Sequence, residues 1–137
     1  MVILSVDLGK ARTGLAICDK SEMLATPLAQ ISEKNPDFLV EKVSSVAMAR
    51  QAEMIVVGLP KNMDGTEGDS AKNARDFAQK LKKRTGLLVR MQDERGTTIT
   101  AHNYLNATNT RGKKRKNVVD SVAATIILQN YLDTTHH

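Results

Sequence analysis

The sequence predicts an α/β fold: a mixed five-stranded sheet flanked by helices, in the order βββαβαβαα. Three β-like runs come first, at 2–6, 14–18 and 24–31, before any helical pattern begins. From residue 35 onward, helical patterns alternate with short apolar runs at 54–57 and 87–91, which is typical of parallel strands joined by helices. We therefore expect three antiparallel strands followed by parallel ones. The chain has 137 residues, close to the usual size of one domain, so residues 1–137 should form a single domain.

The first three strands should form an antiparallel meander. Val2 to Val6 is a continuous aliphatic run that ends at Asp7-Leu8-Gly9, and Gly14 to Cys18 follows after a short basic link. This pattern predicts a hairpin. Leu24 to Ile31 is a weaker third strand. Pro27 within it favours an edge position, because proline has no N–H to donate to a neighbouring strand.

A first helix should begin at Asn35-Pro36-Asp37, which offers a capping side chain, a proline at the first helical position and an acid near the positive end of the helix dipole. Its inward face follows at helical spacing and comprises Leu39, Val43, Val46, Ala47 and Arg50. A buried strand, Met54 to Val57, then ends at Gly58-Leu59-Pro60. The polar loop from Lys61 to Asp69 separates this strand from the next helix.

Ser70 is the predicted cap of the second helix and Gly86 its stop. Leu87 to Met91 is the fifth predicted strand. Beyond it we expect a short helix at 97–105, a loop at 107–116 and a final helix from Val118 to Leu132. The inward face of that final helix is predicted to comprise Val119, Val122, Ala123, Ile126 and Ile127.

Charge is distributed unevenly along the chain. The net charge is +5, but residues 1–69 carry 7 basic and 10 acidic side chains, whereas residues 70–137 carry 13 and 5. A basic half favours a nucleic-acid partner, because each lysine or arginine placed on a phosphate releases a counterion. There is no Trp, and only two Tyr and two Phe, so contacts with the phosphate backbone are favoured over stacking on bases.

Cysteine usage and hydropathy bear on the compartment. Cys18 is the only cysteine, so no disulfide can form within the chain. No apolar stretch approaches about 18 residues, and no charged leader precedes the first strand. We therefore expect a soluble cytoplasmic protein with no membrane partner.

Three acids lie where predicted elements begin or end: Asp7, Glu94 and Asp120. A carboxylate among aliphatic side chains costs several kcal/mol unless it is paired or binds a cation. Two divalent ions about 4 Å apart, which clamp the attacking and leaving oxygens of a phosphate, need such a cluster of oxygen ligands. The pattern indicates a metal-dependent phosphodiesterase.

Each acid also has a purely structural interpretation. Asp7 could simply start a turn, and Arg95 could neutralise Glu94. Asp120 would lie at the third position of a helix capped by Asn117, near the favourable end of its dipole. Asp93 and Glu94 should point to opposite faces of the sheet, so only one of them can join Asp7. The residue pattern by itself leaves open which one does.

Basic and polar side chains near these acids are candidates for nucleic-acid contact. The densest run is 111–116, which has five cations in six residues and is predicted as a loop. In the loop after 54–57, Asn62 or Thr66 could line a cleft, or the loop could be a turn held by its own side chains. The full set of candidates is Lys10, Arg12, Asn62, Arg95, Arg111, Lys113, Lys114, Arg115 and Lys116.

Taken together, the motifs span the chain. They are Asp7-Leu8-Gly9 with Gly14, Val57 to Pro60 with Asn62, Asp64-Gly65-Thr66, Asp93-Glu94-Arg95 with Thr97-Thr98, Lys113 to Lys116, and Val119-Asp120-Ser121 with Ala123-Ala124. In this combination the chain resembles the YqgF or RuvX family of Holliday junction resolvases, which have a ribonuclease H-like fold.

The resemblance implies an endonuclease that uses Mg²⁺ or Mn²⁺, with two ions, and acts on branched DNA or on the 5′ end of the 16S ribosomal RNA precursor. By match of motif, Asp7, Glu94 and Asp120 become the catalytic, metal-binding acids, and Glu94 becomes the inward member of its doublet. A monomer or weak homodimer is expected. The alternative is a ribosome-assembly factor that keeps the fold and binds nucleic acid without cutting it.

Overall fold

Five strands form one sheet in the computed structural model, which describes residues 1–94 and 113–135, and of residues 113–120 only the helical backbone. The strands are β1 (Ile3–Leu8), β2 (Thr13–Cys18), β3 (Ala25–Ile31), β4 (Met54–Leu59) and β5 (Leu88–Asp93). Their order across the sheet is β3-β2-β1-β4-β5. The pairs β1–β2 and β2–β3 are antiparallel, whereas β1–β4 and β4–β5 are parallel. The predicted mixed sheet is confirmed.

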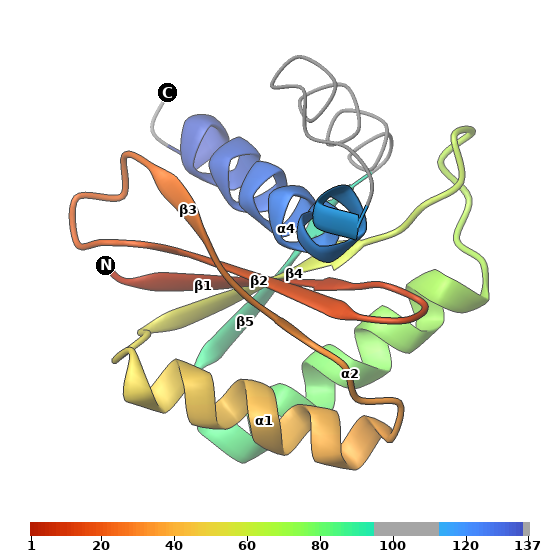
Figure 1. Cartoon of the computed structure of the whole chain (residues 1–137), viewed down its shortest axis with the longest axis horizontal. Coiled ribbons are helices and arrows are strands. Elements are labelled where there is room, and N and C mark those ends of the chain that lie inside the picture. The colour runs from red at the N-terminus through yellow and green to blue at the C-terminus, as the bar shows by residue number, and fades with distance from the viewer. Residues whose placement is uncertain (95–112, 136–137) are drawn as a thin grey trace.

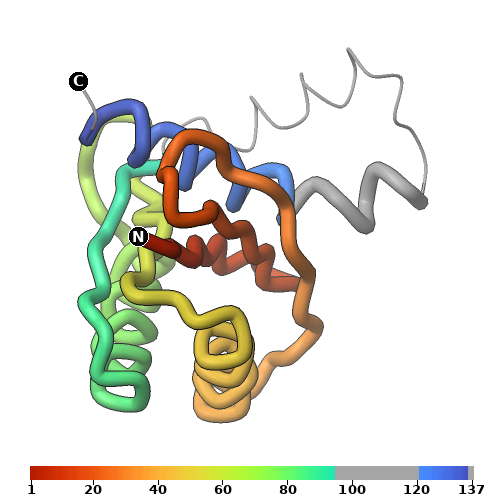
Figure 2. The backbone as a smooth tube through the Cα atoms, turned by 90° about the vertical axis from the view of Figure 1, so that its left-hand side faces the viewer, coloured from red at the N-terminus to blue at the C-terminus, as the bar shows by residue number. Residues whose placement is uncertain are grey.

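Helices cover both faces of the sheet. α1 (Pro36–Ala49) and α2 (Asp69–Thr85) lie on one face, and α4 (Lys113–Thr135) crosses the other (Figures 1 and 2). Because side chains alternate along a strand, Leu4 and Val6 pack toward α1 and α2, whereas Ile3 packs toward α4. By the same alternation, Ser5 and Asp7 belong to the α4 face. Among the described helices, none is long and apolar enough to cross a membrane.

Several local predictions are confirmed. β3, with its Pro27, lies at an edge of the sheet. The side chain of Asn35 caps α1 by accepting hydrogen bonds from the backbone N–H groups of Asp37 and Phe38, at 2.9 and 3.1 Å. Gly86 ends α2 in the left-handed conformation, with a φ of 72° that favours glycine.

Two details of the first two helices were predicted wrongly. Arg50 does not join the inward face of α1, because the helix ends at Ala49 and Arg50 is its exposed C-cap. Ser70 does not cap α2, because the helix begins one residue earlier, at Asp69. Gly68 is the N-cap and provides no side-chain hydrogen bond.

α4 begins at Lys113, five residues before the predicted start. Lys113 to Lys116 therefore form the first turn of a helix instead of the end of a loop. The physical reason is that lysine and arginine favour helices almost as much as leucine, so a charge run need not be irregular. The predicted helix at 97–105 and the loop up to residue 112 lie outside the described residues.

The earlier start changes the position of Asp120 within the helix. It is the eighth residue of α4, so it is neither capped by Asn117 nor near the helix start, where the dipole effect is confined. The inward face agrees with the prediction at Ala123 and Ile127 and differs at Val122 and Ile126, whereas the side chain of Val119 lies outside the described residues. The fully buried apolar residues of this face are Ala123, Ala124, Ile127, Leu128 and Leu132, whereas Val122 and Ile126 are only half-buried.

A buried hydrogen bond fixes α4 on the sheet. Ser5 Oγ donates to the backbone carbonyl oxygen of Ala124 at 2.7 Å. Farther along α4, Leu132 packs in the same cluster as Ile3 and Met54, and the Tyr131 hydroxyl lies 3.8 Å from the sulfur of Met54. The C-terminal half of α4 thus lies over the start of β1, so the helix runs antiparallel to that strand.

Replacing Ser5 by alanine should lower the free energy of unfolding by about 1 kcal/mol, because it removes a buried hydrogen bond. Urea denaturation measures this loss. Ser44→Ala is a matched control, since Ser44 Oγ is buried yet makes no hydrogen bond within the described part of the chain. That variant should be as stable as the wild type or more so. Equal losses in both variants would contradict the role assigned to Ser5.

Candidate active site

Asp7 is a buried carboxylate at the carboxyl end of the central strand. It lies in β1 opposite Gly14 of β2, and its residue is only 7% exposed. Alternation along β1 directs it to the face that α4 covers. A charged group in such a place needs partners or a cation. The position agrees with the predicted ending of the first strand.

Glu94 brings a second carboxyl group to Asp7. It directly follows β5, and its backbone N–H donates to the carbonyl oxygen of Leu59 in β4 at 3.1 Å. Burial raises the pKa of Glu94 to about 9, and the charge of Asp7, a hydrogen bond with the Asp7 side chain and the charge of Asp93 add to the rise. The neighbouring Asp93 is exposed. Of the doublet, Glu94 is therefore the acid that meets Asp7.

The backbone of Asp120 lies across from Asp7. Asp7 is two residues beyond Ser5 on the same face of β1, about 7 Å along the strand. Asp120 is four residues before Ala124, about 6 Å along the helix. Because Ser5 bonds to Ala124 and α4 runs antiparallel to β1, these two steps point the same way. The side chain of Asp120 lies outside what the structure describes.

The Asp7–Glu94 pair has the chemistry of a divalent-cation site. Carboxylate oxygens are the ligands that Mg²⁺ and Mn²⁺ prefer. In the metal-free protein the two groups disfavour each other's ionisation, as the raised pKa of Glu94 shows. A bound cation would offset both negative charges. Among the side chains described, no three of His, Cys, Asp and Glu are grouped closely enough to hold a metal ion.

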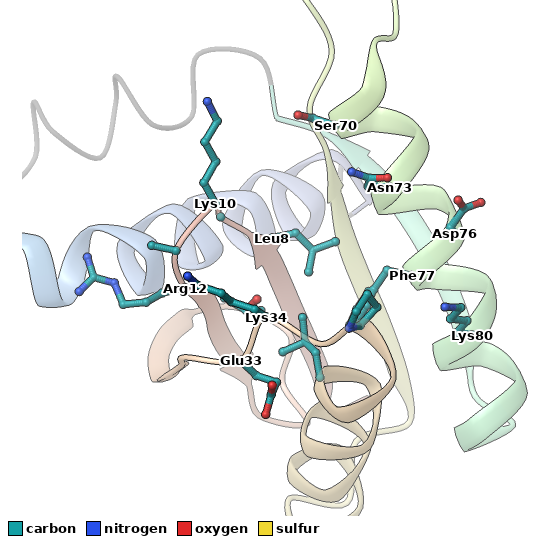
Figure 3. Close-up of a pocket in the computed structure, with 15 residues that line it drawn as sticks. Leu8, Lys10, Arg12, Glu33, Lys34, Ser70, Asn73, Asp76, Phe77 and Lys80 are labelled. Atoms are coloured by element: carbon teal, nitrogen blue, oxygen red, sulfur yellow. The ribbon is translucent and has the colours of Figure 1, made fainter.

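Lys10 and Arg12 lie at the turn between β1 and β2, at the same end of the sheet as Asp7. The turn is closed by a hydrogen bond from the N–H of Gly9 to the carbonyl oxygen of Arg12, at 3.0 Å. It borders a cavity of about 660 Å³ on the α1 and α2 side of the sheet. In Figure 3, Leu8 and Phe77 point toward each other across this cavity, whereas Lys10 and Arg12 extend outward from the turn.

Asn62 is occupied within its own loop. Its side-chain amide donates to Thr66 Oγ1 at 2.9 Å, and its backbone N–H donates to the Thr66 carbonyl oxygen at 2.8 Å. Asp64 Oδ1 in turn accepts from the backbone N–H and the hydroxyl of Thr66, at 2.9 and 2.7 Å. These bonds match the interpretation of the segment as a turn held by its own side chains.

The remaining basic candidates are only partly placed. Lys113, Lys114, Arg115 and Lys116 occupy the first turn of α4, and their side chains are not described. Arg95 and Arg111 lie outside the described residues.

Two residues beside the acids, Ser5 and Gly58, are not predicted from the sequence as part of the site. Ser5 was read as part of an aliphatic run, although a buried serine implies a hydrogen-bond partner. Gly58 was assigned to the loop after the fourth strand, but it lies inside β4. A glycine within a buried strand is a signal of close approach by another group, and that signal was available in the sequence.

The chain is similar to known proteins over almost its whole length. Residues 1–134 match the model of the RuvX family, described as Holliday junction resolvase. A protein from Halothermothrix orenii, named "Putative pre-16S rRNA nuclease", is 41% identical over 133 residues, which are 97% of this chain and 95% of the relative. A protein of the same name from Listeria monocytogenes is 40% identical over 138 residues, covering 99% of this chain and all of the relative.

Two solved structures share the fold across the chain. RuvC of T. thermophilus, in complex with a Holliday junction substrate, has a TM-score of 0.63 at 13% identity and covers 99% of this chain and 96% of its own. The Fowlpox virus resolvase, in complex with Holliday junction DNA, has a TM-score of 0.65 at 11% identity and covers all of both chains. The predicted ribonuclease H-like fold is confirmed.

Proposed function

The chain belongs to the RuvX family of Holliday junction resolvases, and from this premise we propose that it is a metal-dependent endonuclease that processes the 5′ end of the 16S ribosomal RNA precursor. Relatives about 40% identical over nearly their whole length carry the name of that rRNA nuclease. The observation that carries the proposal is the meeting of Asp7 and Glu94 at the end of the central strand. Resolvases and nucleases of this fold generally use divalent metal ions.

In this proposal Asp7, Glu94 and Asp120 hold the metal, with Asp7 placed centrally between the other two. Two Mg²⁺ or Mn²⁺ ions would activate the attacking water and stabilise the leaving oxygen of the phosphodiester. The carboxylates fix the ions and thereby the position of the scissile phosphate, because each comes from a separate rigid element. No protein nucleophile is required.

Basic side chains at the same end of the sheet would hold the substrate backbone. Lys10 and Arg12 lie three and five residues after Asp7, at the turn that follows β1. The proposal also assigns substrate contacts to the neutral Asn62 and, on the sequence pattern alone, to Arg95, Arg111, Lys113, Lys114, Arg115 and Lys116. Contacts to phosphates position a nucleic acid without reading its sequence, so the structure of the RNA, more than its bases, would determine where it is cut. The proposal implies that the protein acts in the cytoplasm, where the rRNA precursor is found. It would act there as a monomer or weak homodimer.

One experiment compares two substrates under a single set of salt and Mn²⁺ conditions. Purified protein is incubated with a 16S rRNA precursor and with a four-way DNA junction, with and without EDTA. We expect cuts at the 5′ end of the precursor that need Mn²⁺, and weaker or no cleavage of the junction.

Three results would change the proposal. Preferential junction cleavage would make DNA the substrate. Salt-sensitive binding without cleavage, indifferent to Mn²⁺, would favour the assembly factor that binds nucleic acid without cutting it. Cleavage that survives EDTA would contradict the metal requirement.

A further inference from the structure

We propose that Gly58 positions Glu94: the missing side chain at this point of β4 opens the path by which the Glu94 carboxyl group crosses the strand to reach Asp7. The inference rests on the proposed metal site. In it, Gly58 is a positioning residue and not a metal ligand.

The order of the strands creates the need for such a path. β4 lies between β1, which carries Asp7, and β5, which leads to Glu94. Neighbouring strands are about 4.8 Å apart, so the end of β5 is roughly 10 Å from β1. The Glu94 side chain must therefore pass over β4 to approach Asp7. Any side chain that β4 presented on that face would stand in the way.

Gly58 is the β4 residue at the crossing point. Ile55 and Val57 pack toward α1 and α2, whereas Met54 and Val56 pack toward α4, so alternation places Gly58 on the α4 face. A Cβ atom built on Gly58 would collide with the Glu94 carboxylate oxygen Oε2, and it would lie 3.0 Å from Cδ of Glu94 and 2.7 Å from Cδ1 of Ile127. The Glu94 carboxyl group thus occupies the space of the absent side chain.

Backbone conformation does not explain this glycine. Glycine is required where φ is positive, and the positive-φ glycines among the described residues are Gly65 and Gly86. Gly58 has an ordinary strand conformation that any residue could adopt, and glycine weakens a strand interior. The remaining explanation for glycine at position 58 is the space that its missing side chain leaves for the Glu94 carboxyl group.

An added methyl group at this position would displace Glu94 rather than Ile127. Ile127 is fully buried in the cluster formed with Met54, Val56 and Leu128, and close-packed interiors yield little. Glu94 is only half-buried, and its carboxyl is the far end of a flexible side chain. We expect the displaced carboxyl group to lie farther from Asp7 as well.

The test is Gly58→Ala, with Mn²⁺ affinity measured by calorimetry alongside cleavage. We expect Mn²⁺ binding to weaken by about 10-fold to 100-fold, the usual effect of losing a residue that orients a ligand. Gly68→Ala is the matched control: a Cβ there has no neighbour within 4 Å, so metal binding and cleavage should not change.

A second variant distinguishes an effect on the position of Glu94 from an effect on core packing. Any loss of thermal stability in Gly58→Ala that comes from contact between the new methyl and Cδ1 of Ile127 should be relieved in the double variant with Ile127→Val, because valine lacks that atom. Mn²⁺ affinity should stay low, because Glu94 is still displaced. Recovery of Mn²⁺ affinity together with stability would overturn the proposal, since the defect would then be one of packing alone.

A crystal structure of the double variant provides a readout independent of metal. The Glu94 carboxyl should have moved away from Asp7, and an unmoved carboxyl would overturn the inference even if wild-type protein bound no Mn²⁺. If wild-type protein binds Mn²⁺ and Gly58→Ala does not, while neither cuts nucleic acid, the proposed function fails but the role of Gly58 stands.

Discussion

Replacing Asp7 by asparagine should reduce metal-dependent cleavage by about 10³-fold or more. Asp7 is the central acid of the proposed site, and metal ions contribute several kcal/mol of transition-state stabilisation, of which each 1.36 kcal/mol is a factor of ten. The fold should be retained, because asparagine has nearly the same shape and removes the negative charge that Asp7 presents to Glu94. Single-turnover cleavage of the preferred substrate measures the loss, and urea denaturation measures stability.

Asp93→Asn provides the matched control for this prediction. Asp93 also lies at the carboxyl end of a strand, but it is exposed and its neighbour Glu94 is the acid that meets Asp7. Its variant should cleave at close to the wild-type rate and bind nucleic acid equally well. Metal-dependent cleavage by Asp7→Asn at the wild-type rate, in a preparation free of other nucleases, would rule out the proposed metal site.

Without metal, the protein should lose stability as the pH rises. The pKa of Glu94 is raised from 4.5 to about 9 in the folded state. In the folded protein the Glu94 carboxyl group therefore stays protonated up to about pH 9. In the unfolded chain it loses its proton above about pH 4.5. The stabilising contribution is complete below about pH 4.5 and is lost as the pH rises toward 9. At one pKa unit per 1.36 kcal/mol, the loss by pH 7 is on the order of 3 kcal/mol.

The measurement is the free energy of unfolding between pH 5 and 9 in EDTA, for wild type and Glu94→Gln. Other groups also titrate, so the difference between the two proteins isolates Glu94. Wild type should lose stability relative to Glu94→Gln as the pH rises, and Mn²⁺ should restore it, because a ligand of the folded state stabilises that state. Glu41→Gln, at an exposed position on α1, should run parallel to wild type. A constant difference between wild type and Glu94→Gln would contradict the buried pairing with Asp7.

Much of the fold could be predicted from local patterns. Strand periodicity, the Asn35 cap, the Gly86 stop and the edge position of Pro27 each depend on a few neighbouring residues, and each agrees with the structure. α4 was placed too late because solvated loops and exposed helical turns have the same charged composition. Asp120 shows the consequence: its predicted place near the helix start, where the dipole would favour it, depended on where the helix begins.

The site could be predicted only in part, because its geometry depends on how distant elements are arranged. Alternation showed that one of Asp93 and Glu94 faces Asp7, but the spatial order of the strands does not follow from local pattern. That order places β4 between the acids and gives Gly58 its significance. The bond between Ser5 and Ala124 joins residues 119 positions apart, a separation that no local pattern reports.

The docking of α4 by Ser5 has a consequence for how the protein is made. Asp7 is in the first strand to leave the ribosome, whereas Asp120 is in α4, the last of the described elements to emerge. During synthesis all five strands leave the ribosome before α4, which covers one face of the sheet. Asp120, the proposed third acid, is therefore the last of the three to emerge. If Asp120 holds the metal as proposed, the site stays incomplete until α4 has docked on the sheet.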